Sequence, residues 1–512
     1  MFSHLMQFIR QVWQRLFPFR DVAAVEHIDS PLSNEMITAL DLWYKMYTAA
    51  PPWMDGEKVK TLNLPALICS EIARQVMLEM KWTISGKPDE DGNSEANERS
   101  EYLKAEFEKL IRMLRSKLEQ GCAAGGMTIK PYPKDGHIYF DCSTAWSLYP
   151  VAFDDDGNLK DVIFRDSFQD GKTTYTRLER HQVTPDGVQV TQRAFKSSQR
   201  ENIGVEIPLT DVPQWAEVEP EALLKDTDGQ MFGWFKTATA NNVDVGAPMG
   251  VSVFSKASNL IKEADIQYSR ILWEYEGSEL AIDVDPTALR PKKGANGVME
   301  MPKLNERLFR GVDLGSEDNY NVFSPTIRDS SLFAGLNQLL MRIEDNCGLA
   351  RGTLSDANTE ARTATELRIV RQRTYATIAD NQAALEVCLR DVVRAMDKYA
   401  SMYNLAPEGE YDVSFEWDDS ILTDAAQQLG ERLELLSNGL MGQVEFRMWY
   451  FGETKAQAQA AVDAIQQERI KQNVESMMAM GGMGGQGATP PTGHDPTTKP
   501  VPSEELGGDN LC

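Results

Sequence analysis

Three stretches of the sequence contain glycine patterns that bind phosphates or hold a catalytic serine in other proteins. Residues 482–487 read G-x-G-x-x-G, but a dinucleotide site needs a strand before this motif and a helix after it, and Pro490-Pro491 follows here. Gly171-Lys172-Thr173 ends like a Walker loop, whose leading glycine position holds Asp166. Residues 250–254 resemble a nucleophile elbow without its last glycine. These stretches therefore predict neither a nucleotide site nor a catalytic serine.

The sequence does not predict a metal site either. Asp154, Asp156 and Asn158 have the spacing of the first ligands in an EF-hand calcium loop. Leu159 and Arg165 stand at the positions that need glycine and glutamate, so the pattern is more typical of a hairpin turn. The 5 histidines form no H-E-x-x-H motif, and the 6 cysteines form no C-x-x-C pair. We therefore expect no cofactor, no bound metal, reduced cysteines and no enzymatic activity.

Arginines gather between residues 351 and 373. They are Arg351, Arg362, Arg368, Arg371 and Arg373. The acids beside them are Asp356, Glu360 and Glu366. One interpretation is the start of a helix with local ion pairs, each of which contributes little to stability. The other is a functional patch that faces phosphate groups or a neighbouring subunit.

The spacing of apolar residues predicts an α+β fold that would position these groups. Helices are expected over 34–47, after Pro65, and over 102–118, 256–280, 331–346, 363–403, about 422–437 and 454–475. Residues 127–215 alternate with a period of two and contain Asp-Gly turn pairs, which predicts an antiparallel β unit. Residues 281–326 form a small irregular segment with short strands at its ends, and 410–418 alternate as a strand with one acidic face.

The amino-acid composition and net charge exclude some classes of protein. The 512 residues are 42% hydrophobic and 25% charged, which is typical of a globular chain with several structural units. No apolar run approaches the roughly 20 residues of a membrane-spanning helix. The 77 acidic residues outnumber the 52 basic ones, for a net charge of -25. This balance argues against a protein that grips DNA through a basic surface.

The first 20 residues predict an amphipathic helix. Its apolar face includes Phe2, Leu5, Ile9, Trp13 and Leu16. Arginines interrupt the apolar run and no small-residue cleavage site follows, so the segment is not a signal peptide. Three interpretations fit it: an arm that docks on another protein, a peripheral membrane helix, or a helix folded onto its own domain.

Four further stretches follow one another in a recognisable order. They are LWYKMY at 42–47, MFGWFK at 231–236, the polar region 348–367, and the segment 437–454. Together they resemble bacteriophage portal proteins of the SPP1 type. The resemblance covers residues 35–470, and the order and spacing of the stretches carry it rather than any single motif.

The resemblance implies a portal-protein fold with long stem and wing-crossing helices, an antiparallel β wing unit, a small α/β clip, a helical C-terminal crown and a disordered tail. The implied divisions are an N-terminal arm (1–30), wing (31–255), stem helix (256–280), clip (281–326), second stem helix (327–347), tunnel loop (348–362), long wing helix (363–405), wing and crown region (406–475) and disordered tail (476–512).

The resemblance also implies a dodecameric ring around a central channel for double-stranded DNA. The implied channel loop contains Leu354, Ser355, Asp356, Ala357, Asn358, Thr359 and Glu360. The basic residues expected at the channel or between subunits are Arg351, Arg362, Arg368 and Arg371. The expected clip surface contains Lys292, Lys293 and Arg307. The net negative charge suits a conduit that does not hold the DNA passing through it.

The implied partners are further copies of the chain, the large terminase subunit, a head-completion or adaptor protein, and major capsid and scaffold proteins. No small-molecule substrate is implied, and DNA would pass without sequence specificity. The implied location is the portal vertex of the virion, with assembly in the host cytoplasm. Two alternatives stay open: another structural head or tail-connector protein, and an enzyme that uses carboxylates in a cleft of the β unit.

Overall fold

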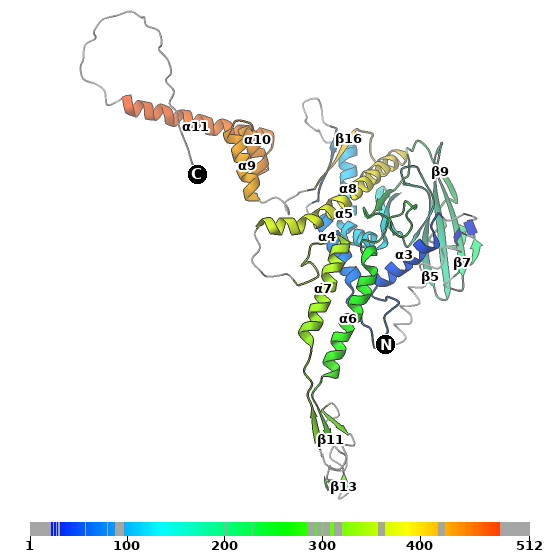
Figure 1. Cartoon of the computed structure of the whole chain (residues 1–512). Coiled ribbons are helices and arrows are strands. Elements are labelled where there is room, and N and C mark those ends of the chain that lie inside the picture. Colours follow the sequence, from blue (N-terminus) through cyan, green and yellow to red (C-terminus); the bar gives the residue numbers. More distant parts are fainter. Residues whose placement is uncertain are drawn as a thin grey trace, which may run out of the picture. The chain divides into compact units, whose positions relative to one another are not determined.

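The structure is a computed structural model in which the chain divides into two compact units, Met1–Leu422 and Thr423–Cys512 (Figure 1). Each unit is described by itself. The described residues are 22–23, 25–26, 28, 31–56, 58–78, 80–87, 97–199, 202–227, 229–284, 292–293, 299–300, 308–311, 320–356, 364–417 and 425–481. The first unit combines helices with sheets, so the predicted α+β class is confirmed.

Three helices begin the core of the first unit. They are α3 (Asn34–Tyr47), α4 (Leu64–Met77) and α5 (Glu98–Ala124). The last is longer at both ends than the predicted 102–118. Asn97 and Ser100 form a capping box that starts the helix before its first apolar residue. At the other end the helix continues through Gly121. A Cβ at residue 121 would lie 3.0 Å from Met127 Cγ, so this contact needs a small residue.

Two antiparallel sheets stand where one β unit was predicted. The larger contains β4 (Leu148–Phe153), β5 (Leu159–Asp170), β6 (Thr173–Thr184), β7 (Gly187–Ser197) and β8 (Val205–Ile207), with β9 (Glu221–Leu224) also paired to β7. The smaller has the order β10 (Gly233–Lys236), β2 (Gly126–Lys134) and β3 (His137–Thr144). The antiparallel strands predicted over 127–215 are confirmed, but they divide between two sheets, and β2 also pairs with β10, which lies beyond that range.

A third pairing joins distant parts of the first unit. Strand β1 (Met80–Gly86), which the sequence analysis does not predict, pairs antiparallel with β16 (Tyr411–Trp417). The strand predicted over 410–418 is confirmed, and Asp412 and Glu416 lie on its exposed face. The opposite face packs on α5, where the Phe107 and Phe415 ring centroids are 6.2 Å apart.

The long helix α8 (Ala364–Met402) packs against the smaller sheet. Its bounds agree with the predicted 363–403. Gly233 of β10 faces the helix backbone, where a Cβ would lie 2.3 Å from the carbonyl oxygen of Cys388. A glycine at 233 is therefore needed for this close approach. The fully buried side chains of Leu385, Leu389 and Val392 join α8 to the main core.

The helices α6 (Ser258–Gly277) and α7 (Asp329–Cys347) lie side by side, as Figure 1 shows. Both were predicted within a few residues. The chain between them forms β11 (Ala281–Val284), β12 (Lys292–Lys293), β13 (Met299–Glu300), β14 (Phe309–Gly311) and β15 (Tyr320–Phe323). The central strand β11 pairs with β14 in parallel and with β15 antiparallel. The two predicted short strands, 281–284 and 320–323, are confirmed.

The second unit is helical. It contains α9 (Ala425–Ser437), α10 (Gln443–Phe451) and α11 (Lys455–Gly481). Two helices were predicted here; α10 is a third, set between Gly442 and Gly452, with the Phe446 and Tyr450 rings stacked at 5.8 Å. Helix α11 also continues past residue 476, where the tail was expected to begin, so that boundary is wrong. The glycine-rich motif at 482–487 lies outside the described residues.

The other motifs that resemble known sites have structural explanations. The Asp154 Oδ1 atom accepts hydrogen bonds from the amides of Asp156 (3.1 Å) and Asn158 (2.7 Å), which confirms the predicted hairpin turn. Gly171 has a φ of 59° in the turn between β5 and β6. Ser252, the candidate elbow serine, is fully buried. A buried serine cannot present its hydroxyl to a substrate in the way that an exposed nucleophile does.

Candidate functional site

The α6–α7 pair is fixed by polar contacts as well as by its apolar seam. Ile261, Ile271 and Ile343 are buried along the pair. The side-chain amide of Gln267 donates to the carbonyl oxygen of Leu332 at 3.3 Å. At the far end of the pair, Arg328 donates two hydrogen bonds to Glu274, at 3.1 and 2.8 Å. The two helices therefore form a defined unit rather than two independent extensions.

The outer surface of this pair exposes large apolar side chains. Trp273 is 68% exposed and Phe333 is 47% exposed. Tyr275, in the last turn of α6, is 41% exposed, and Leu280, just after the helix, is 53% exposed. A solvent-exposed tryptophan beside other apolar residues is typical of a surface that another protein covers.

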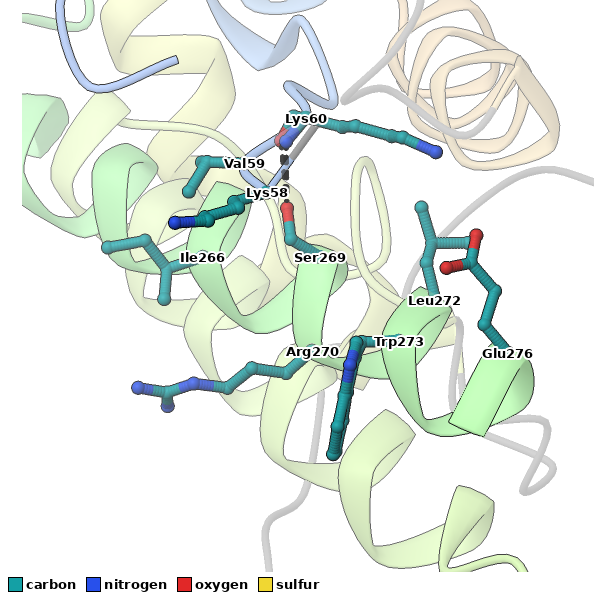
Figure 2. Close-up of a pocket in the computed structure, with 9 residues that line it drawn as sticks. All are labelled: Lys58, Val59, Lys60, Ile266, Ser269, Arg270, Leu272, Trp273 and Glu276. Atoms are coloured by element: carbon teal, nitrogen blue, oxygen red, sulfur yellow. Dashed lines mark hydrogen bonds between the residues drawn. The ribbon is translucent and has the colours of Figure 1, made fainter. Parts of the chain in front are cut away.

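A shallow cleft of about 260 Å³ lies beside Trp273 (Figure 2). It is lined by Lys58, Val59, Lys60, Ile266, Ser269, Arg270, Leu272, Trp273 and Glu276. Residues 53–56 and 58–62 form a strap across α6 at this cleft. The strap is held by Asp265, which accepts hydrogen bonds from Trp53 Nε1 (3.0 Å) and the Leu62 amide (2.8 Å), and by Ser269, which accepts from the Lys60 amide (2.9 Å).

The side chains that line the cleft are suited to binding another molecule. Lys58, Lys60 and Arg270 are exposed cations, and Trp273 adds an apolar surface next to them. The Ser269 hydroxyl is not available as a nucleophile because it donates to the Asp265 carbonyl oxygen at 2.7 Å. Cationic side chains around a tryptophan suit an acidic or aromatic protein surface.

The segment that follows α7 is built around Glu344. This glutamate has no exposed surface. Its carboxylate accepts hydrogen bonds from the amides of Gly352 (3.1 Å) and Ser355 (2.8 Å), from the Leu354 amide, and from the Ser355 hydroxyl (2.8 Å). The Asp356 amide donates to Asn337 Oδ1 at 2.8 Å. Residues 352–356 are thus tied to α7.

The next residue of α7, Asp345, is an ion-pair centre. Arg351 and Arg373 each donate to it at 2.8 Å, and Arg342 lies 3.8 Å away. The hydrogen bond from Arg351, together with the charges of Arg351 and Arg373, lowers the pKa of Asp345. All three guanidinium groups are more than half exposed. Three cations share one carboxylate, so positive charge remains accessible to a partner.

The structure places part of the predicted channel loop. Leu354 is partly buried against the main core and Ser355 is 7% exposed, so these two residues of the predicted loop pack within the chain. Asp356 is exposed. Ala357, Asn358, Thr359 and Glu360 lie outside the described residues.

The predicted basic residues are only partly described. Arg351 and Arg373 both pair with Asp345. The acids expected beside the cluster were Asp356, Glu360 and Glu366. Arg368 and Arg371 belong to α8, but their side chains are outside the described set, as is Arg362 altogether. The structure therefore brings together two of the five clustered arginines, around a carboxylate that the sequence analysis does not name.

The other two predicted surfaces lie mostly outside the described residues. Lys292 and Lys293 form β12, whose backbone pairs with that of Glu300 and Met299 in β13. The side chains of both lysines are outside the described set. Arg307 is not among the described residues. The same holds for the arm residues Phe2, Leu5, Ile9, Trp13 and Leu16.

Sequence reasoning missed Glu344 and the Lys58–Arg270–Trp273 surface. Glu344 is one of many acids in the chain, and nothing in its local pattern distinguishes a buried carboxylate from a solvated one. Trp273 does carry a signal: it stands on the polar side of the periodic helix 256–280, where an aromatic residue is unusual in a solvated face.

The described residues hold no group of three or more metal-ligating side chains arranged to bind an ion. Burial raises the pKa of the Cys122 and Cys347 thiols to about 12, which keeps them protonated and poorly nucleophilic. Within the described part of the chain, helices long and apolar enough to cross a membrane are absent.

Comparison with known families finds a match. Residues 61–473 match the family described as Phage portal protein, SPP1 Gp6-like. The match covers most of the chain, so the protein belongs to this family of phage portal proteins, as the sequence resemblance indicates. The comparison with curated proteins finds no match.

Membership defines the coarse role of the protein. The family is structural rather than enzymatic, and its members belong to a capsid-associated oligomeric assembly at a vertex of the virion. The role lies in virion assembly and genome packaging.

Proposed function

We propose that the protein forms a dodecameric ring that conducts double-stranded DNA into and out of the capsid. The observation that carries this proposal is the exposed apolar surface of the α6–α7 pair in a chain of the portal family. Trp273 and Phe333 expose much of their area in the single chain. A cyclic ring covers such a surface by repeating one heterologous contact around the axis, so that each copy is both donor and acceptor of the contact.

In this assembly α6 and α7 are the stem helices and residues 281–326 are the clip. Residues 31–255 and α8 form the wing, and the helices after β16 lead to the crown. This assignment is supported by the order of the elements: two paired helices enclose a small strand-rich segment and are followed by a loop and the longest helix of the chain.

Residues 354–360 are the channel loop, and Arg351 lies beside it as a contact to phosphates or to the neighbouring copy. The accessible charge of Arg342, Arg351 and Arg373 supports this role. Asp356 is one of the described residues of this loop. Its exposed carboxylate repels phosphates and limits how strongly DNA is held.

The clip docks the large terminase subunit during packaging and a head-completion protein afterwards, through Lys292, Lys293 and Arg307. The N-terminal arm meets capsid or scaffold proteins while the capsid assembles in the host cytoplasm. The proposal rests on the place of this strand-containing segment in the chain, between the end of α6 and the start of α7, since connecting segments of this kind lie at the surface.

Native mass spectrometry of the purified full chain tests the ring. The proposal expects one dominant species of twelve copies at moderate salt. An assay of DNA packaging with the purified terminase then tests the conduit. A dispersed monomer at micromolar concentration contradicts the ring, and packaging that proceeds equally without the protein contradicts the conduit.

A further inference from the structure

Glu344 occupies an unfavourable position for a carboxylate. It lies in the last turn of α7, which ends at Cys347, and the carboxyl end of a helix carries a partial negative charge. It is also completely buried, and a buried charge loses its hydration. An exposed residue at this position would avoid both costs, so the neighbouring groups must offset them.

The donors that do so all come from the segment after the helix. The carboxylate accepts from three backbone amides, at 352, 354 and 355, and from one hydroxyl, that of Ser355. The Ser355 hydroxyl in turn accepts from the Gly352 amide at 3.0 Å, which closes a tight turn around the carboxylate. Hydrogen bonds to a charged acceptor are stronger than those to a neutral one.

The same segment is fixed on its other sides. The Ala350 amide donates to Thr374 Oγ1 of α8 at 2.6 Å. The Asp356 amide donates to Asn337 Oδ1, and Asn337 lies two helical turns before Glu344 on the same face of α7. The chain from Ala350 to Asp356 therefore folds back along α7 from one defined point to another.

We propose that Glu344 is the positioning residue of the segment 350–356. Its carboxylate gathers the amides of Gly352, Leu354 and Ser355 and so sets the place of Asp356, where the segment passes into the rest of the predicted channel loop. The anchoring role follows from the hydrogen bonds alone. Its consequence for DNA rests on the proposed function of the loop.

Hydrogen exchange of the full-length ring tests the anchor. In Glu344→Ala the amides of Leu354 and Ser355 lose their acceptor and the Gly352 amide keeps only the Ser355 hydroxyl, so peptides covering 350–356 should exchange about tenfold faster or more than in the wild type. Glu344→Gln keeps an acceptor oxygen but no charge, and should fall between the two. Ser355→Ala removes the hydroxyl bonds and leaves the carboxylate, so it should also exchange faster than the wild type, by a smaller factor.

Glu263→Ala is the matched control, because Glu263 is an exposed carboxylate on α6. It should leave exchange over 350–356 unchanged. If Glu344→Ala does not assemble, Ser355→Ala and Glu344→Gln carry the test. Exchange at the wild-type rate in both of these variants overturns the anchoring role.

Packaging of DNA in the same variants separates the anchor from the loop's function. Faster exchange with reduced packaging supports both. Faster exchange with packaging at the wild-type level confirms the anchor and contradicts the proposed contact between this loop and DNA. Wild-type exchange overturns the anchor whatever the packaging result.

Discussion

The outer face of the α6–α7 pair exposes apolar side chains to solvent, whereas the segment after α7 encloses a buried carboxylate whose hydrogen-bond donors lie in the same chain. On the outer face Trp273 is 68% exposed, and Ile266 and Leu272 line the same cleft. In the segment, Glu344 has no exposed surface and each of its carboxylate oxygens accepts hydrogen bonds from the same chain. The hydrogen bonds of residues 352–355 to Glu344 form within one copy, whereas the outer face leaves apolar area that the proposed ring would cover. We therefore expect the segment to be ordered within a single copy and the outer face to be buried only in the proposed ring.

Trp273→Glu should have the largest effect. It places a carboxylate where the account expects an apolar contact between copies, at a cost of roughly 3 kcal/mol or more for each interface of the ring. Because the contact repeats, we expect rings to be lost and smaller species to appear in sedimentation velocity at micromolar concentration. Val245→Glu is the control, since Val245 is 88% exposed in the loop between β10 and α6, and its rings should persist. Normal rings from the Trp273 variant would show that this face is not the interface.

Asp265→Ala tests whether the strap across α6 belongs to the same rigid surface. The substitution leaves Trp53 Nε1 and the Leu62 amide without their acceptor, and we expect the free energy of unfolding to fall by about 2–4 kcal/mol. Urea unfolding at a fixed protein concentration measures this. Asp55→Ala, in the exposed part of the strap, should change little. Equal losses in the two variants would mean that Asp265 does not hold the strap.

Arg351→Ala should have the smallest effect on stability, because the ion pair with Asp345 is more than half exposed on the arginine side and solvent screens it. The pKa of Asp345 is lowered in the folded chain. Its contribution is therefore present above the unfolded pKa of about 4 and is lost as the pH falls through the lower folded value. The difference between wild type and variant should shrink below pH 4 in urea unfolding. A difference that grows on acidification would refute the pairing.

Sequence patterns predicted the elements whose signals are local. The three- and four-residue spacing in α6, α7 and α8 and the Asp-Gly turns of the larger sheet depend on neighbours in the chain. The strand β16 was predicted because its acidic and apolar residues alternate strictly. The short helix α10 was missed because nine residues between two glycines give too few repeats to show a period.

Pairings across long sequence distances could not be predicted. The register of β1 against β16 depends on strands separated by more than 300 residues, and neither strand carries information about its partner. Glu344 illustrates the same limit for the candidate site. A glutamate in an acidic chain reads as solvated, and its burial becomes evident only when the amides that follow Arg351 turn back onto it.

We propose that copies of the chain assemble through the outer face of α6 and α7. Electron cryomicroscopy of the purified protein can show whether they do. We expect a closed ring in which Trp273, 68% exposed in the single chain, is covered by the neighbouring copy. A closed ring that leaves Trp273 open to solvent would contradict the claim, and so would the absence of any ring.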